Sequence, residues 1–105
     1  MKITKQEKAE VKDTMEKRGI QVFFFPEYDC TVALRMPSPD SATVHVSIAI
    51  KSMDEPKFKK SVGRFLTVRG LEEGRYLPYV TPSNPDDYDS EHIALHIASC
   101  FGRIN

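Results

Sequence analysis

The sequence predicts one α+β domain, in which helices pack on an antiparallel sheet of three strands, or of four if the segment 74–88 adds an edge strand. Two patterns predict this class. Apolar residues alternate with a period of two from Ile20 to Ile50, which is typical of strands, and recur at helical spacing after about residue 52. The 105 residues have room for one hydrophobic core, so we expect a single domain over residues 1–105. The predicted order is one helix, three strands and two helices.

The first helix is predicted from about Lys5 to Arg18. Thr4 and Glu7 form a T-x-x-E capping box, in which each side chain can accept a hydrogen bond from the other residue's backbone amide. Gly19 can end the helix in a left-handed conformation. Most other positions carry charges, so the helix offers the core only a narrow apolar stripe.

Three strands are predicted to follow. Alternation over residues 20–25 predicts the first strand, which Pro26 ends because proline lacks the backbone amide that a sheet ladder needs. Residues 30–36 and 43–50 alternate in the same way on either side of the turn-rich segment 37–40, which predicts a hairpin.

Alternation also predicts which strand residues share a face of the sheet. One face is expected to carry Ile20, Val22, Phe24, Val32, Leu34, Val46 and Ile48. We expect the last two helices to cover this face. The opposite face is expected to carry Phe23, Phe25, Arg35 and His45. It would be open to solvent or covered by the first helix.

The second helix is expected to begin within residues 54–56 and to run to about Arg69. The acidic residues and the proline of this segment suit a helix start, where negative charge is favourable and a missing amide costs little. Gly63 in the middle costs about 1 kcal/mol relative to alanine. It therefore either allows a close approach of the helix backbone or bends the helix.

The last helix is predicted after an extended, proline-containing connection over residues 74–88, part of which can form the additional edge strand. Asp89 or Ser90 can cap the first turn of this helix, and Gly102 can end it.

Charge and cysteine content limit the class of protein. Fifteen basic side chains balance 15 acidic ones, so no overall field draws the chain to a polyanion or a membrane. The segment 1–18 is charged throughout, so we expect neither a signal peptide nor a membrane span. Cys30 and Cys100 are expected to be reduced, structural thiols in a cytoplasmic protein.

Catalysis has little support in the sequence, which contains no glycine-rich phosphate loop, nucleophile elbow or C-x-x-C motif. His92 and His96 are one helical turn apart and could share a metal ion. No third ligand is evident, so two solvated histidines are the better interpretation. We expect a nonenzymatic protein that uses no cofactor and no metal.

One candidate binding surface is aromatic and consists of Phe23, Phe25, Tyr76, Tyr79 and Tyr88. If their face of the sheet is uncovered, Phe23 and Phe25 form an apolar patch that a partner protein or a second copy of the chain would cover. The tyrosines lie among prolines and have the composition of a recognition surface, although tyrosines also anchor loops to their own domain.

A second candidate surface is basic and consists of Lys51, Lys57, Lys60 and Arg64. Spacings of three and four would align Lys57, Lys60 and Arg64 in a stripe on the second helix. Such a stripe could contact the phosphates of a nucleic acid, and the alternative is a solvated helix face.

Between Val46 and Leu71, a strand ending in small residues is followed by spaced charged, aromatic and glycine residues. The spaced residues are Asp54, Phe58, Lys59 or Lys60, Gly63, Arg64, Arg69 and Leu71. This pattern resembles one in small accessory proteins of tailed bacteriophages and prophages, whose functions are unassigned. The resemblance implies a bacterial host cell as the setting. We therefore expect an accessory protein that binds and inhibits a host or defence protein, with nucleic-acid binding as the alternative.

Overall fold

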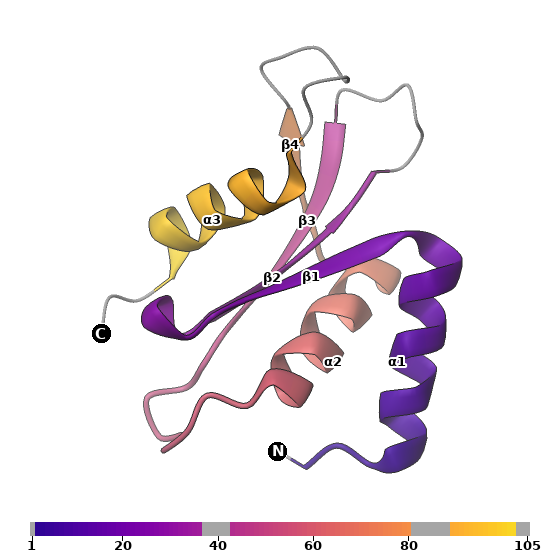
Figure 1. The fold of residues 1–105 in the computed structure, drawn as a ribbon, viewed down its shortest axis with the longest axis vertical. Coiled ribbons are helices and arrows are strands. Elements are labelled where there is room, and N and C mark those ends of the chain that lie inside the picture. The colour runs from indigo at the N-terminus through magenta and orange to yellow at the C-terminus, as the bar shows by residue number, and fades with distance from the viewer. Residues whose placement is uncertain (1, 37–42, 81–88, 103–105) are drawn as a thin grey trace.

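The computed structural model describes residues 2–36, 43–80 and 89–102, and within them it confirms the α+β class, with helices on an antiparallel sheet (Figure 1). The elements in chain order are α1 (Lys5–Arg18), β1 (Ile20–Phe25), the 3-10 turn η1 (Pro26–Tyr28), β2 (Cys30–Arg35), β3 (Thr43–Ile50), α2 (Lys60–Glu72), β4 (Leu77–Val80) and α3 (Ser90–Phe101). The predicted order is confirmed, and β4 is the additional edge strand.

The described strands pair in the order β1-β2-β3-β4, and each is antiparallel to its neighbour. Val32 at the middle of β2 lies opposite Phe23 of β1 on one side and Ile48 of β3 on the other. After α2 the chain returns to the sheet, where Leu77 of β4 lies opposite Val46. The sheet therefore has β2 and β3 at its centre and β1 and β4 at its edges.

The start of α1 confirms the predicted capping box. The Thr4 hydroxyl oxygen accepts a hydrogen bond from the Glu7 backbone amide, and the Glu7 carboxylate accepts one from the Thr4 amide, both at 3.1 Å. The hydrogen bond from the Thr4 amide is the main cause of a lowered pKa of the Glu7 carboxyl. Gly19 follows the helix with a φ of 62°, a left-handed conformation that suits glycine. Local sequence signals thus set both ends of α1.

The predicted start of α2 is wrong, because the helix begins at Lys60 rather than within residues 54–56. The Glu55 amide donates to the Ser52 carbonyl at 3.1 Å, and the Lys51 ammonium donates to the Glu55 carbonyl at 2.7 Å. The polar groups of this segment are therefore satisfied in a turn, and the helix starts only after it.

The predicted assignment of β1 side chains to the two sheet faces is also wrong. Because Phe25 pairs with Cys30 and Phe23 with Val32, these phenylalanines share a face with the apolar side chains of β2. Ile20, Val22 and Phe24 point to the other face.

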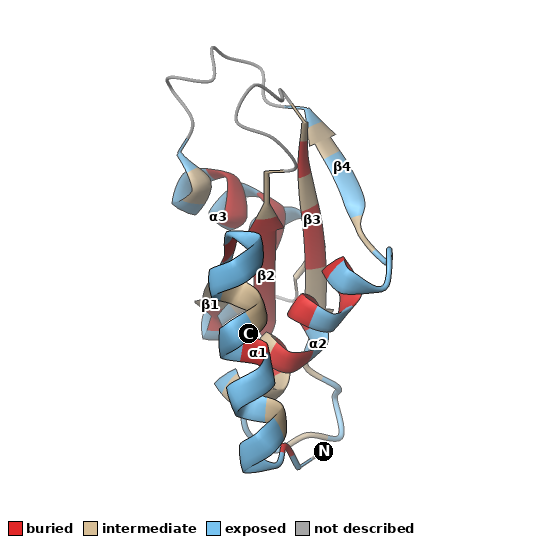
Figure 2. Cartoon of the chain, turned by 90° about the vertical axis from the view of Figure 1, so that its right-hand side faces the viewer, coloured by how far each residue is buried: buried red, intermediate tan, exposed pale blue. Residues whose placement is uncertain are grey.

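The last two helices cover opposite faces of the sheet, contrary to the prediction. α3 packs on one face, while α1 and α2 pack together on the other (Figure 1). The core beneath α3 includes Phe25, Cys30, Val32, Leu34, Val44, Val46, Ile93, Ala94, Ile97 and Ala98. The core beneath α1 and α2 includes Ile3, Val11, Ile20, Ala33, Phe65, Val68 and Leu71. Figure 2 shows buried residues along β2 and β3 and on the helix surfaces that face them.

Two glycines bring the backbone of α2 close to the sheet. A Cβ atom on Gly63 would collide with the side chain of Thr31 on β2. A Cβ atom on Gly70, two turns later, would lie 2.5 Å from the Ser47 hydroxyl oxygen on β3. Of the two explanations for the mid-helix glycine, the close approach is therefore confirmed.

We predict that Gly70→Ala lowers the free energy of unfolding by up to about 2 kcal/mol, measured by urea denaturation. Overpacking costs about 1–3 kcal/mol, which outweighs the roughly 1 kcal/mol that alanine gains over glycine in a helix. Ser47→Ala in the same chain removes the closest atom and leaves the Arg75 carbonyl oxygen as the nearest neighbour, at 3.3 Å. Gly70→Ala should therefore cost much less stability when it is added to Ser47→Ala than when it is added to the wild type. Equal losses in the single and double variants would contradict the close approach.

Candidate nucleic-acid interface

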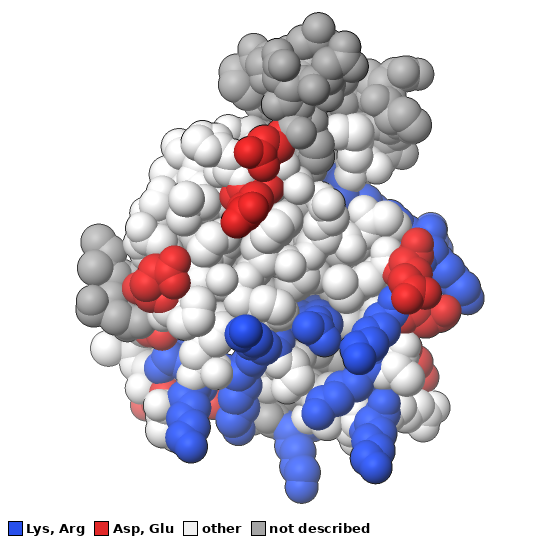
Figure 3. Space-filling model, viewed as in Figure 1, with Lys and Arg blue, Asp and Glu red and all other residues white. Residues whose placement is uncertain are grey.

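Basic side chains gather on the part of the molecule formed by α1 and α2 (Figure 3). Lys5, Lys8 and Lys12 are spaced by three and four residues, so they lie along one flank of α1, and all are exposed. The opposite flank of α1 carries Glu7 and Glu10, which line a hollow between α1 and α2. The helix thus separates its lysines from these carboxylates.

Two cations of α2 lie over an aromatic ring of β1. The Lys60 ammonium and the centre of the Arg64 guanidinium are each 5.5 Å from the centroid of the Phe24 ring. Phe24 and Arg64 are half-buried and Lys60 is exposed, and the attraction between a cation and a ring face holds both head groups beside the ring. Lys5, Lys8, Lys12, Lys60 and Arg64 together are called the basic surface below.

The cations of the basic surface differ from Lys17, Arg18, Arg35, Arg69 and Arg75, which form ion pairs. Within residues 2–36, 43–80 and 89–102, none of its side chains forms an ion pair with another described residue. Lys17, in contrast, lies 2.9 Å from the Asp13 carboxylate. Arg69 and Arg75 lie 2.8 and 2.7 Å from Glu73, whose pKa is lowered chiefly by the hydrogen bond from Arg69. The arginines near the end of α2 are therefore paired with carboxylates, whereas the cations of the basic surface are not paired with a described carboxylate.

The start of α2 adds positive potential to the same region. The N-cap residue Lys59 makes no side-chain hydrogen bond to the first turn. Thr4 caps α1, and the Asp89 carboxylate accepts a hydrogen bond from the His92 amide at the start of α3. The uncapped first-turn amides of α2 carry partial positive charge.

The structure divides the basic residues that the sequence grouped together. Lys60 and Arg64 meet at Phe24, but Lys57 precedes α2, so the predicted stripe of three on one helix is wrong. The Lys51 ammonium is held by the Glu55 carbonyl at 2.7 Å.

Lys51 and Lys57 instead line a separate pocket of about 240 Å³. Its apolar wall includes Val62 and Leu66, which lie on a different flank of α2 from Lys60 and Arg64. These two lysines therefore do not extend the basic surface.

Sequence reasoning missed four residues of this region, which are Lys5, Lys8, Lys12 and Phe24. The three lysines carried a signal, since spacings of three and four along a capped helix predict one flank. Phe24 carried none, because its contact with α2 depends on which face of the sheet it occupies.

The expected exposed patch of Phe23 and Phe25 is wrong. Phe25 is only 8% exposed and belongs to the core beneath α3, and Phe23 is half-buried against that core. The η1 turn and the residue after it set the β1–β2 pairing that turns both rings toward α3. Helix α3 therefore covers most of the surface that a partner or a second copy was expected to cover.

The predicted recognition tyrosines lie on different parts of the fold. Tyr76 stacks on His45 with ring centroids 4.0 Å apart, and the Arg35 guanidinium lies 5.8 Å from the Tyr76 centroid. Burial, and secondarily Arg35, lower the pKa of His45, which favours its neutral form. Tyr79 contacts the ring of His96 edge-on at 6.4 Å, and Tyr88 lies outside the described residues.

The described residues contain neither a metal cluster nor a helix long and apolar enough to cross a bilayer. Both His92 and His96 are exposed on α3. His96 lies 3.9 Å from the Cys100 sulfur and beside Tyr79, and no group of three or more histidine, cysteine or acidic side chains surrounds a common point in this part of the chain.

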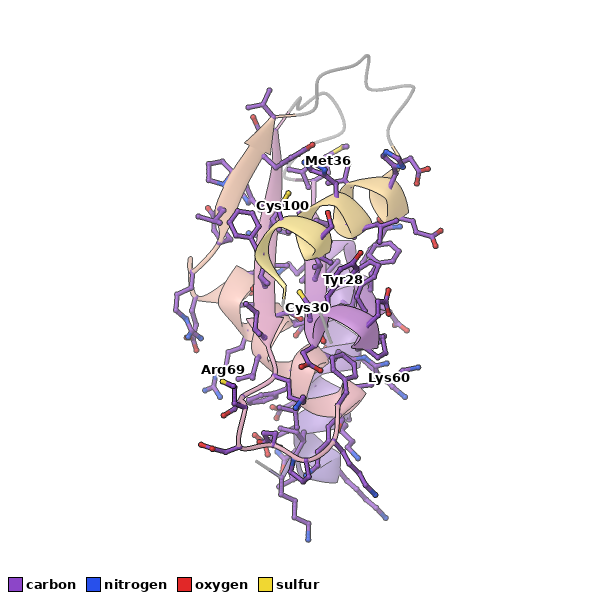
Figure 4. All side chains as sticks on the ribbon, turned by 90° about the vertical axis from the view of Figure 1, so that its left-hand side faces the viewer. Tyr28, Cys30, Met36, Lys60, Arg69 and Cys100 are labelled. Atoms are coloured by element: carbon purple, nitrogen blue, oxygen red, sulfur yellow. The ribbon has the colours of Figure 1, made fainter. Side chains whose placement is uncertain are left out.

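The two thiols differ in burial. Cys30 is fully buried in β2, and Cys100 is exposed on α3 (Figure 4). The same figure shows Lys60 and Arg69 on opposite sides of α2. Burial raises the pKa of the Cys30 thiol to about 11.

We predict that iodoacetamide at about pH 8 modifies Cys100 and spares Cys30, because the thiolate is the reactive form and burial disfavours it at Cys30. Mass spectrometry of the native protein should show a single modification, and Cys100→Ser should remove it. Unfolding in urea should expose Cys30 and restore one modification in that variant. Rapid labelling of Cys30 in the native protein would contradict its burial.

No related protein adds evidence for the role of the basic surface. Comparison of the chain with protein-family models, with curated proteins and with solved structures found no match.

Proposed function

We propose that the protein binds nucleic acid, with the phosphates held by the basic surface. The observation that carries this proposal is the placement of Lys60 and Arg64 over Phe24, in the part of the molecule formed by α1 and α2 where basic side chains gather (Figure 3). Cations that lack carboxylate partners are available to neutralise phosphates. The arrangement also needs no catalytic group.

Charge separation accounts for a nucleic-acid binder with a formal net charge of zero. Asp13, Glu72 and Glu73 pair with cations outside the basic surface. A local excess of positive charge at Lys60 and Arg64 and along the lysine flank of α1 can therefore act on a polyanion, although the whole chain is neutral. Attraction to a polyanion would act over about 10 Å and depend strongly on salt, since that is the screening length at about 0.1 M.

We predict that Lys60→Glu with Arg64→Glu, and separately Lys8→Glu with Lys12→Glu, each weaken nucleic-acid binding at least tenfold. Fluorescence anisotropy with a labelled oligonucleotide at about 50 mM salt would measure the effect. The logarithm of the wild-type affinity should fall with the logarithm of salt concentration with a slope of about −3 to −5 if up to five phosphates are neutralised. Circular dichroism would verify that each variant is folded.

A matched control is Lys17→Glu with Arg75→Glu, which changes the net charge equally at exposed positions outside the basic surface. This variant should bind within about twofold of the wild type, because the fields of distant exposed charges are screened. Equal losses in the control and the two test variants would show a general charge effect and contradict the proposed surface. Absence of wild-type binding at low salt would contradict the function itself.

Binding and inhibition of a host or defence protein is a second candidate function, supported by exposed apolar residues on the edge strand β4. Leu77 is 53% exposed and Val80 is 68% exposed, on either side of the half-buried Tyr79. Edge strands with exposed apolar side chains suit a protein contact. A bacterial protein that is captured by the wild type and lost with Leu77→Ser and Val80→Ser would support it, whereas capture that is unchanged would contradict a role for β4.

A further inference from the structure

We infer that the nucleic acid is double-stranded and that the basic surface contacts its phosphate backbone without stacking on its bases. This inference rests on the proposed function and concerns the class of nucleic acid. It follows from the state of the aromatic rings near the basic surface and from the rigidity of the elements that carry its cations.

The first step concerns Phe24, the ring that lies within the basic surface. Proteins that bind single strands without sequence preference stack successive bases on open aromatic faces, which contributes about 1–3 kcal/mol per base. Lys60 and Arg64 both lie 5.5 Å from the Phe24 centroid, and the ring is half-buried beside α2. A base could stack on Phe24 only by displacing these cations, which are the groups that would bind phosphate.

The second step concerns the other rings of the described chain. Phe65 of α2 is 7% exposed, and the Arg69 guanidinium lies 5.2 Å from its centroid. Tyr76 is stacked on His45. Phe101 is 54% exposed but belongs to α3, which covers the opposite face of the sheet. Phe58, just before α2, is half-buried and lines the separate pocket with Lys51 and Lys57. Within the described residues, the basic surface as defined above therefore contains no open aromatic ring besides Phe24.

The third step concerns spacing and stiffness. Lys5 and Lys12 are seven residues apart in α1, which corresponds to about 10 Å of helix. A duplex carries one charge per roughly 1.7 Å of its axis and is stiff over about 50 nm. Cations carried on a rigid helix can face several phosphates of a stiff duplex without ordering a flexible strand. A single strand would lose conformational entropy on the same surface without gaining stacking energy.

The uncapped start of α2 is consistent with a backbone contact. Its first-turn amides lie next to Lys59 and Lys60 and can donate to a phosphate oxygen, as helix N-termini do. Duplex DNA and duplex RNA present the same phosphate chemistry, so the inference covers both, and the experiment below separates them.

The test compares four labelled ligands of one sequence and a length of about 20 nucleotides: duplex DNA, duplex RNA and the corresponding single strands. Anisotropy titrations would use the full chain at about 50 and 200 mM salt. We expect at least one duplex to bind tenfold or more tightly than its single strand, and a scrambled duplex to bind equally. The duplex that binds more tightly would identify DNA or RNA as the target.

Single strands that bind as tightly as the duplexes, or more tightly, would overturn this inference and leave the proposed function intact. No binding by any ligand would overturn the proposed function. A Phe24→Leu variant adds an independent readout, because leucine fills the site without an aromatic face. We expect it to leave the duplex to single-strand affinity ratio within about twofold, whereas a selective loss of single-strand binding would show that Phe24 stacks on bases and contradict the inference.

Discussion

The close approach of α2 to the sheet at Gly63 and Gly70 determines where the cations of α2 lie relative to Phe24, and the basic surface depends on that contact. With side chains at these two positions the helix would be held further from Thr31 and Ser47. At the observed distance one flank of α2 lies over β1, where Phe24 supports its cations. Other residues of the helix reach the core shared with α1. Backbone packing at two glycines thus determines where charge is displayed.

The distribution of ion pairs determines which cations of α2 are available to bind an anion. An exposed lysine paired with a carboxylate contributes little to stability and little to the outer field. The pairs around Glu72 and Glu73 neutralise the arginines near the end of α2, including Arg35 at 3.7 Å from Glu72. The start of α2 lacks such partners among the described residues. One helix therefore has a neutralised end and a positive end.

Local signals in the sequence predicted much of the fold. The capping box at Thr4, the left-handed Gly19 and the alternation over the strands each depend on neighbouring residues, and each is confirmed. The predicted start of α2 was wrong. Residues 54–56 are acidic residues and a proline that suit a helix start, but hydrogen bonds from the backbone and from Lys51 hold this segment in a turn. Hydrogen bonds of that kind cannot be read from residue type alone.

The candidate site was only partly predictable for the same reason. Lys60 and Arg64 share a flank by helical spacing, so the sequence identified them together. Their contact with Phe24 depends on the face that β1 presents, and the pairing of β1 with β2 reversed the expected face. Among the described residues Lys8 and Lys12 form no ion pair, although Glu16 lies one turn from Lys12 on α1, so residue spacing alone does not show which cations are paired.

The short connection between β1 and β2 determines which side chains of β1 enter the core beneath α3 and which lie against α2. Four residues, Pro26 to Asp29, separate the paired ends of the two strands, and Asp29 has a φ of 51°. Since neighbouring side chains of a strand point to opposite faces, one residue more or fewer there would direct Phe24 toward α3 and Phe25 toward α2. Natural variation in this connection should therefore preserve its length, and should keep at position 29 a residue that tolerates a left-handed conformation, such as aspartate, asparagine or glycine.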